Sequence, residues 1–501
     1  MPGARCRRLC RTYYSEGRRS AAHLPVSTTG PDMTDVIVIG AGPAGAFAAH
    51  RAADLGARTT LVARDEFGGM AANDGPVPVR TLAHAARLLR EAHQLDRYGI
   101  TGDGFRLDYP RLLARVREVV HDVRTQSDLR DRVDGLGVTV HEHAGTASFV
   151  DPHTVETSGG LRLHGDKIIL CTGGVSRPLT VPGAELTHTH SDAWALREVP
   201  PSMLVIGGGA TGAQVASIFT AFGSRVELFE KGPRILPTED DDVSAVVAEA
   251  FRERGMVVRE NFDAIESFDK TSDGVLMHFT QNGAPASAEA ALVVVAIGWT
   301  ADTIGLNLAA AGVATDERGF VRVDAYQRTS VPHIFAAGDV TGRLMLVPQA
   351  SQSGFIAATN AVRGPAVPMW DQVSPIGSFT DPEYAQVGLT ETKARKEHDV
   401  IVATVGLDAA TRPVIDGRTT GFCKLIVDRT SNQILGCHVV GERAVETTQL
   451  AAVAMTARMR VEELARIPLS FPTYAGIVGR AAYIATRRLE RDAGRDLNEA
   501  S

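Results

Sequence analysis

The segment Asp35-Val-Ile-Val-Ile-Gly-Ala-Gly-Pro-Ala-Gly45 constrains the fold of this chain more than any other. Its run of four β-branched apolar residues predicts a buried strand, and Gly40, Gly42 and Gly45 mark a tight turn into an alanine-rich helix. In such a turn the first glycine permits the bend, the second lets backbone approach a pyrophosphate, and the third lets helix and strand pack closely. The helix N-terminus adds N–H groups and a positive dipole. The pattern predicts a dinucleotide site, although a purely structural turn is the alternative for one copy alone.

A second copy of this pattern, Val-Ile-Gly-Gly-Gly-Ala-Thr-Gly, lies far downstream. Its glycines are Gly207, Gly209 and Gly212. The next expected strand, 225–230, ends in Glu230, and a carboxylate there accepts the ribose hydroxyls and repels a 2′-phosphate. NADH is therefore favoured over NADPH, with Lys231 and Arg234 as basic neighbours that weaken this preference. A solvated glutamate at a strand end is the alternative interpretation of Glu230.

The first unit lacks the matching acid. Its second strand is expected over 58–63, and Ala63 occupies the position where an acid usually holds the adenosine ribose. Arg64, Asp65 and Glu66 follow. We therefore expect the adenosine end to be held in another way, by Asp65 or Glu66.

Composition excludes several classes of function. The chain has 501 residues and a formal net charge of -7, which argues against a nucleic-acid or anionic-membrane surface. No apolar run reaches the ~18–20 residues that cross a bilayer. The five cysteines are scattered, without metal-ligand or paired spacing in the part expected to fold, so we expect buried thiols in a reducing cytoplasm, and no metal site. The Arg-rich leader at 1–33, with Cys6 and Cys10, is expected to be disordered or to reflect a misassigned start, since Met33 lies two residues before Asp35; an organellar transit peptide is the alternative.

The segment Gly68-Gly-Met-Ala-Ala-Asn-Asp-Gly-Pro-Val-Pro-Val-Arg80, ahead of a long amphipathic region to about Leu95, resembles the pyridine nucleotide-disulfide oxidoreductases. Lipoamide dehydrogenase and mercuric reductase belong to that family. Its members carry Gly-Gly-Thr-Cys-Leu-Asn-Val-Gly-Cys-Ile-Pro-Ser-Lys here. In this register Gly69 lies in the glycine pair, Ala71 and Pro76 replace the two redox cysteines, and Arg80 replaces the lysine. The resemblance implies a flavoprotein that has lost its redox disulfide.

Further matches to the family run almost to the end of the chain, over about 35–488. The resemblance implies that FAD is held by Gly145, by Thr172 and Gly173 of the Cys-Thr-Gly strand end, and by Gly338 and Asp339. A helix from about Met345 through Ala350 is expected to direct its N-terminus at the isoalloxazine carbonyl, where its dipole favours the anionic reduced flavin. Gly298 ends the strand that leads back from the nicotinamide-binding part, and Trp299-Thr-Ala-Asp-Thr replaces the family's Gly-Arg-x-Pro-Asn.

The C-terminal part, from Ser378 onward, resembles the family's dimerisation domain, with a helical run expected from Ala444 to Met459. Family members end in His-Pro-Thr and a Glu, an acid/base pair that reaches the partner subunit's site. This chain has Phe471 and Gly476 at those positions. Pro472 is retained, and family analogy predicts a cis bond before it.

The predicted fold class is α/β, with two Rossmann-like domains for FAD and NAD(P) and a C-terminal α+β dimerisation domain. The expected FAD domain is split, at 34–187 and 299–370, around an NAD(P) domain at 188–298. The dimerisation domain is expected at 371–490 and a tail at 491–501.

Hydride transfer from NADH to a flavin needs close stacking and no side-chain acid or base, so that half-reaction is expected to survive. Delivery to a disulfide needs a thiolate relay, which alanine and proline cannot provide. We therefore predict an FAD-dependent NAD(P)H oxidoreductase, a homodimer without a membrane span, that passes electrons to a small non-disulfide acceptor, with quinones fitting best. Arg80 is the candidate catalytic residue near flavin N5; an exposed helix arginine is the alternative.

Two other functions stay open: a flavin-dependent dehydrogenase or oxidase that tailors a small metabolite, and a non-catalytic redox-sensing flavoprotein. Phe471 and Tyr474 could form an aromatic wall for a flat acceptor, or serve only as interface core. His188 and His190 lie in a linker and are expected in a solvated loop, because no third metal ligand is near. Cys171 is expected to be a packing residue.

Overall fold

The structure is a computed structural model that describes residues 34–102, 104–126, 129–369, 373–492 and 494. The leader predicted at 1–33 lies outside the described residues, as does most of the predicted tail. The last helix, α15, continues to Asp492 and so includes the first residues of that tail. Within the described residues, no helix is long and apolar enough to cross a membrane.

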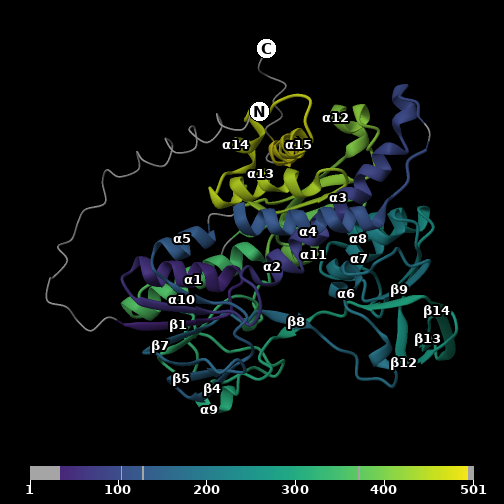
Figure 1. Cartoon of the computed structure of the whole chain (residues 1–501). Coiled ribbons are helices and arrows are strands. Elements are labelled where there is room, and N and C mark those ends of the chain that lie inside the picture. Colours follow the sequence, from purple (N-terminus) through teal and green to yellow (C-terminus); the bar gives the residue numbers. More distant parts are fainter. Residues whose placement is uncertain (1–33, 103, 127–128, 370–372, 493, 495–501) are drawn as a thin grey trace, which may run out of the picture.

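A five-stranded parallel sheet, β17-β7-β1-β2-β3, forms the first nucleotide-binding unit (Figure 1). Its strands are β1 (Asp35–Ile39), β2 (Arg58–Val62), β3 (Thr139–His141), β7 (Lys167–Leu170) and β17 (Ile334–Ala336). Val36 and Val38 face the helices on one side, while Ile37 and Ile39 face a second apolar cluster on the other. This burial on both faces explains why β1 is a continuous apolar run instead of an alternating one.

Two helices far apart in sequence cover the first face of this sheet, α1 (Pro43–Asp54) and α10 (Val347–Arg363). They pack closely because α1 buries mainly alanines and because Gly354 of α10 lies against the backbone of Ala44. The other face carries α9 (Leu308–Ala311) and the small antiparallel sheet β4 (Ala147–Asp151), β5 (Thr154–Thr157) and β6 (Arg162–His164). Three further helices of this part are α2 (Gly69–Asn73), α4 (Tyr109–Gln126) and α5 (Leu129–Gly135).

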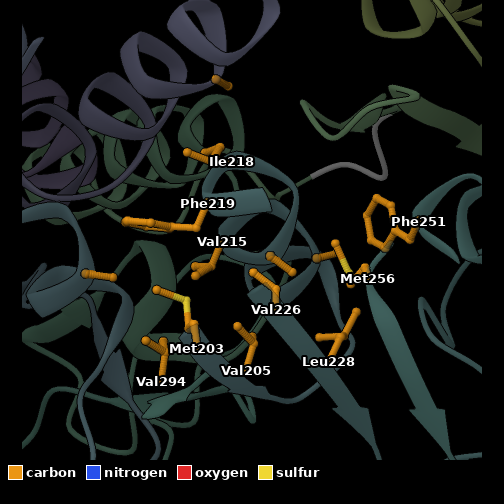
Figure 2. Packing of buried hydrophobic residues seen from close by; sticks show 14 of the residues in the cluster. Met203, Val205, Val215, Ile218, Phe219, Val226, Leu228, Phe251, Met256 and Val294 are labelled. Carbon is orange, nitrogen blue, oxygen red and sulfur yellow. The ribbon is translucent and has the colours of Figure 1, made fainter. Parts of the chain in front are cut away.

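The second nucleotide-binding unit is the parallel sheet β11-β10-β9-β15. Its elements are β9 (Ser202–Ile206), α7 (Ala210–Ala221), β10 (Arg225–Glu230), α8 (Asp241–Glu253), β11 (Val257–Glu260) and β15 (Leu292–Val295). Met203 and Val205 of β9 pack against Val215 and Phe219 of α7, as Figure 2 shows. The opposite face is covered by an antiparallel sheet of β12 (Phe262–Lys270), β13 (Val275–Gln281) and β14 (Ala284–Ala290).

The C-terminal part is a five-stranded antiparallel sheet in the order β18-β19-β22-β21-β20. Its elements are β18 (Ile376–Ser378), β19 (Tyr384–Gly388), α11 (Glu391–Glu397), β20 (Val400–Gly406), α12 (Thr411–Ile415), β21 (Phe422–Asp428), β22 (Ile434–Val440), α13 (Ala444–Thr456), α14 (Val461–Ala465) and α15 (Gly476–Asp492). Helices α13 and α15 pack on one face, at the top of Figure 1. The observed α13 ends at Thr456, three residues short of the expected Met459.

The opposite face of this sheet bears polar residues and meets the start of α8. Glu239, which precedes α8, is 5% exposed, and its Oε1 accepts a hydrogen bond from Gln386 Nε2 at 3.1 Å. Its other oxygen has no partner. Burial therefore raises the pKa of the Glu239 carboxyl to about 7, since the charged form is poorly solvated there.

This pKa predicts a pH-dependent stability. Between about pH 4.5 and 7 the folded protein keeps a proton on Glu239 that the unfolded chain has released, so this group's contribution falls as pH rises. Between pH 4.5 and pH 8, we expect the free energy of unfolding of Glu239→Gln to rise by on the order of 3 kcal/mol relative to that of wild type. Urea unfolding at both pH values measures this, with the exposed Glu317→Gln as the control. If the difference in unfolding free energy between Glu239→Gln and wild type did not change with pH, the raised pKa of Glu239 would be contradicted.

Candidate active site

The turn between β1 and α1 is built from glycines that leave no room for side chains. Gly40 has φ +104°, and a Cβ there would lie 2.2 Å from the carbonyl oxygen of Cys171. A Cβ on Gly45 would lie 1.7 Å from the carbonyl oxygen of Gly40. A Cβ on Gly69 would lie 2.6 Å from Cα of Gly42. The turn therefore presents bare backbone at the N-terminus of α1, the arrangement that accepts a pyrophosphate.

A cavity of about 1020 Å³, here named the main cavity, opens from this turn toward the second nucleotide-binding unit and β18. Its size lies at the upper end of the range for small-molecule sites. All but one of the residues predicted to hold FAD line it. These are Gly40, Gly42, Gly69, Arg80, Gly145, Thr172, Gly173, Gly338, Asp339, Met345 and Ala350. Gly45 does not line the cavity; it lies behind the turn, where it lets α1 approach β1.

Two polar groups in the wall fit a flavin dinucleotide. The hydroxyl oxygen of Thr172 is buried without a hydrogen-bond partner, so the chain alone does not satisfy it. Burial raises the pKa of the Asp339 carboxyl, which faces the cavity and can accept hydrogen bonds from ligand hydroxyls. Asp65 and Glu66, the candidates for the adenosine end, line the cavity as well. The residues present therefore fit FAD.

The helix expected from Met345 begins later than predicted. Helix α10 starts at Val347, with Leu346 as the extended N-cap and Pro348 in its first turn. Proline is favoured in the first turn because it lacks the N–H that would be unpaired there. Met345 lies outside the helix but still lines the cavity.

The second glycine turn repeats the first but lies outside the main cavity. Gly207 has φ +104°, and a Cβ on Gly212 would lie 1.9 Å from the carbonyl oxygen of Gly207. A Cβ on Gly209 would meet nothing within 4 Å, so the turn faces open space at the N-terminus of α7. Thr211 and Gln214 of α7 reach the main cavity. Helix α7 therefore links the second glycine turn to the main cavity.

Glu230 lies beside this second turn. Its Oε2 accepts a hydrogen bond from Gly208 N at 2.8 Å, and its Oε1 accepts one from Gly232 N at 2.7 Å. These backbone contacts fix the carboxylate at the strand end. Gly298, with φ +110°, lies between β15 and β16 (Trp299–Ala301), and its carbonyl accepts a hydrogen bond from Arg177 N at 2.9 Å. Neither residue lines the main cavity.

Arg80 lies on α3 (Pro76–Ala92) and is not the exposed helix arginine of the alternative interpretation. Its guanidinium donates a hydrogen bond to Gln214 Oε1 at 2.7 Å and lies 3.7 Å from the ring centre of Phe379. Burial lowers the pKa of Arg80 to about 10, against the opposing effect of Glu383. The group is therefore still cationic at neutral pH and places a positive charge in the cavity wall.

The segment that carries thiols in the related family holds none here. Ala71 on α2 and Pro76 at the start of α3 both line the main cavity. Cys171 is the only cysteine among the described residues that line it. Its side chain is 5% exposed, and burial raises the pKa of the thiol, so the nucleophilic thiolate is suppressed.

The placement predicted for His190 was wrong. His188 is exposed, but His190 is buried and lines the main cavity as the first residue of α6 (His190–Trp194). Thr189 and Asp192 form a capping box that fixes this helix start. The Thr-x-x-Asp spacing is a signal from which the ordered helix could have been predicted.

Other lining residues were also missed by the sequence analysis: Trp299, Gln214, Phe379, Asp74 and Asp302. Phe379 follows β18, far along the chain from α3, so no local pattern joins it to Arg80. Trp299 pairs with Ser176 where β16 meets β8 (Gly174–Ser176), the ribbon between the two nucleotide-binding units in Figure 1.

The C-terminal residues lie away from the cavity of their own chain. Phe471 is 81% exposed, and Tyr474 donates a hydrogen bond to Asp416 Oδ2 at 3.0 Å. The bond between Phe471 and Pro472 is cis, as predicted. Gly476, which the family resemblance matches to a Glu, begins α15.

Comparison with known proteins agrees with a site for FAD in the main cavity. Residues 34–354 match the family model for pyridine nucleotide-disulphide oxidoreductases, and residues 374–482 match the model for the dimerisation domain of that family. The dihydrolipoyl dehydrogenase of Zymomonas mobilis is 34% identical over 450 residues, covering 88% of this chain and 96% of that protein. The dihydrolipoyl dehydrogenase of Thermus scotoductus is 35% identical over 438 residues, covering 86% of this chain and 92% of that protein.

Solved structures of similar proteins share the fold of this chain. LpdA from Mycobacterium tuberculosis has a TM-score of 0.81 at 27% identity, covering 90% of this chain and 99% of its own. The HOCl-induced flavoprotein disulfide reductase RclA from Escherichia coli has a TM-score of 0.80 at 26% identity, with the same coverage. The predicted α/β fold class is thereby confirmed. With two glycine turns, a cavity that fits a flavin and a dimerisation domain, the chain belongs to the pyridine nucleotide-disulphide oxidoreductase family, as a flavin-dependent enzyme that uses FAD and NAD(H).

Proposed function

We propose that this enzyme oxidises NADH and passes the electrons from FAD directly to a quinone-like acceptor instead of a disulfide. The observation that carries the proposal is the wall of the main cavity, where Ala71 and Pro76 take the places of the family's two cysteines. When bound, the flavin takes a hydride from NADH and supplies the two electrons to the acceptor. No described residue that lines the cavity can replace the missing thiol relay, because Cys171 is a single buried thiol.

The character of the wall supports a flat, apolar acceptor. Trp299, Trp194, Phe379 and Val79 bring aromatic and aliphatic surface to the cavity that Ala71 and Pro76 also line. Aromatic rings favour stacked or edge-on contacts with planar molecules. A quinone takes electrons without covalent chemistry, so such a surface meets its binding requirements. The dimerisation domain supports a homodimer. In such a dimer, Phe471 and Tyr474 are candidates for a further aromatic wall of the partner subunit's cavity.

Arg80 supports the electron transfer through its charge. A guanidinium held in the wall by Gln214 and Phe379 favours an anionic reduced flavin or an acceptor that is gaining negative charge. We therefore propose Arg80 as the catalytic residue of this site. Its pKa of about 10 keeps it charged at the pH at which such an enzyme works.

The preference for NADH follows from Glu230 and its neighbours. A carboxylate beside the second turn repels a 2′-phosphate. Arg234 does not offset this charge, because its guanidinium donates to the carbonyl oxygens of Leu236 and Glu239 and pairs with Asp241 at 2.8 Å. The buried free thiols Cys171, Cys423 and Cys437 suit a reducing compartment, and we propose the cytoplasm.

Steady-state assays with NADH test the proposal, with menadione as a quinone and lipoamide as a disulfide. We expect turnover with menadione and none with lipoamide, because only the disulfide requires a thiolate relay. Ready lipoamide turnover with sluggish menadione reduction would contradict the proposal. Peroxide release that depends on one metabolite would favour a tailoring oxidase, and flavin absorbance that NADH fails to bleach under anaerobic conditions would favour a redox-sensing protein.

A further inference from the structure

One buried imidazole in the main cavity has no role in the function proposed so far. His190 is 5% exposed, and among the described residues that line the cavity it is the only histidine. Its Nδ1 lies 3.3 Å from Ser176 Oγ, which fixes one side of the ring. Its Nε2 has no hydrogen-bond partner. A buried ring nitrogen left without a partner is costly, so it points to a ligand that completes the site.

The surroundings of His190 hold the ring in one orientation and place a partly exposed carboxylate beside it. The ring of Trp299 packs edge-on against it, with 5.0 Å between ring centres. Asp74 Oδ2 lies 3.9 Å from Nε2 and also accepts a hydrogen bond from Ser191 Oγ. The Asp74 side chain is 37% exposed, compared with 6% for that of His190. Asp74 therefore lies between the buried imidazole and solvent.

Asp74 belongs to the segment that has lost its thiols, between Ala71 and Pro76. The acid/base positions near the C-terminus hold Phe471 and Gly476, which cannot carry a proton. Reducing a quinone to a hydroquinone takes two electrons and two protons, and a hydride supplies both electrons but only one proton. A chain that performs this reaction needs a source for the second proton in or beside the cavity.

We propose that His190, which lies between Ser176 and Asp74, is the catalytic acid that protonates the acceptor; this inference rests on the proposed function. Bound FAD, reduced by NADH, would supply the hydride; as the acceptor takes it up, the Nε2–H bond of the imidazolium breaks and an O–H bond forms on the second quinone oxygen. The products would be a neutral imidazole, the hydroquinone and the oxidised cofactor, so protons and electrons balance. The imidazole then takes a proton from water on the side of Asp74.

The charges around His190 give the pH dependence. Burial lowers the pKa of His190, while Asp74, on the turn before α3, and Asp192, on its own helix, act to raise it. The net direction is downward from 6.5, so the imidazolium is the minor form at neutral pH. Acceptor reduction is therefore expected to speed up as pH falls through this pKa. Removing the charge of Asp74 lowers the pKa of His190 further and shifts the profile to lower pH.

Reoxidation of the NADH-reduced holoenzyme by menadione, followed by anaerobic rapid mixing between about pH 5 and pH 8, tests this proposal. We expect His190→Gln to reoxidise about 10²-fold more slowly and to lose the pH dependence. Asp74→Asn shifts the inflection of the profile to lower pH. His278→Gln is the matched control, because His278 Nε2 pairs with Asp269 at 2.9 Å on the surface of the β12–β14 sheet, and it leaves the rate unchanged.

A second readout does not depend on turnover. Histidine ring resonances of the FAD-loaded protein, assigned by comparison with His190→Gln, report the titration of His190 directly, and Asp74→Asn moves this titration to lower pH. Equal rates and pH profiles in wild type and His190→Gln overturn the role of His190 and leave the proposed function standing. Failure of reduced wild type to pass electrons to menadione at any pH overturns both.

Discussion

Alanine at Gly45 will yield a protein that is purified with less FAD than wild type. The added Cβ would lie 1.7 Å from the carbonyl oxygen of Gly40, which is a backbone atom and cannot rotate away, so the turn must open. Overpacking of this kind costs on the order of 1–3 kcal/mol. If the β1–α1 turn must bear this strain whenever it binds FAD, the affinity for FAD drops by about 10- to 100-fold. The ratio of flavin to protein absorbance after purification measures the loss.

Gly212→Ala is the matched variant in the second turn, where the Cβ would lie 1.9 Å from the carbonyl oxygen of Gly207. It is expected to keep FAD and to lose NADH binding by a similar factor, seen as slow bleaching of the flavin. Gly135→Ala, whose Cβ meets nothing within 4 Å, is the control for both. If Gly45→Ala retained FAD as wild type does, the first turn would not be the flavin site.

Methionine at Lys424 will destabilise the protein by about 3–5 kcal/mol. The side chain of Lys424, on β21, is 3% exposed, and its Nζ contacts Asp242 at 2.7 Å, Asp240 at 2.9 Å and Glu391 at 3.3 Å. Burial opposes the charged amine, but hydrogen bonds to Asp242 and Asp240 outweigh it and raise the pKa of Lys424. Its removal leaves the carboxylate of Asp240, 4% exposed, without its cation.

His438 cannot replace this charge, because burial lowers the pKa of its imidazole although Nε2 lies only 3.5 Å from Asp240. Chemical unfolding of the FAD-loaded protein measures the effect, with the exposed Lys393→Met as the control. A change for Lys424→Met no larger than that of the control would mean that these charges do not join the C-terminal sheet to the second nucleotide-binding unit.

The sequence was sufficient for those parts of the site that depend on local pattern. The β1 turn could be predicted because three glycines at fixed spacing follow a β-branched run, and a turn of this kind tolerates few other sequences. The same holds for the second turn at Gly207. Asp339 was predicted from the family resemblance, and it lines the cavity with residues of the first turn.

Contacts between distant segments could not be predicted in this way. Arg80 meets Gln214 and Phe379, which come from α7 and from beyond β18, and no periodicity links these positions. The β12–β14 sheet was missed because β14 reads Ala-Pro-Ala-Ser-Ala-Glu-Ala, with little of the β-branched or aromatic character that predicts strands. His190 was placed in solvent because its burial arises from Trp299 and Ser176, on strands that pair only in the fold.

Anaerobic reductive titration of the FAD-loaded enzyme tests the central claim most directly, since it counts the electrons that the site holds. A flavin alone accepts two electrons, whereas a flavin beside a redox disulfide accepts four. We predict that two electrons per FAD bleach the flavin completely, without a long-wavelength band from a thiolate next to the ring. Uptake of four electrons per FAD, or the appearance of that band, would show that a thiol relay exists and would contradict direct transfer from flavin to acceptor.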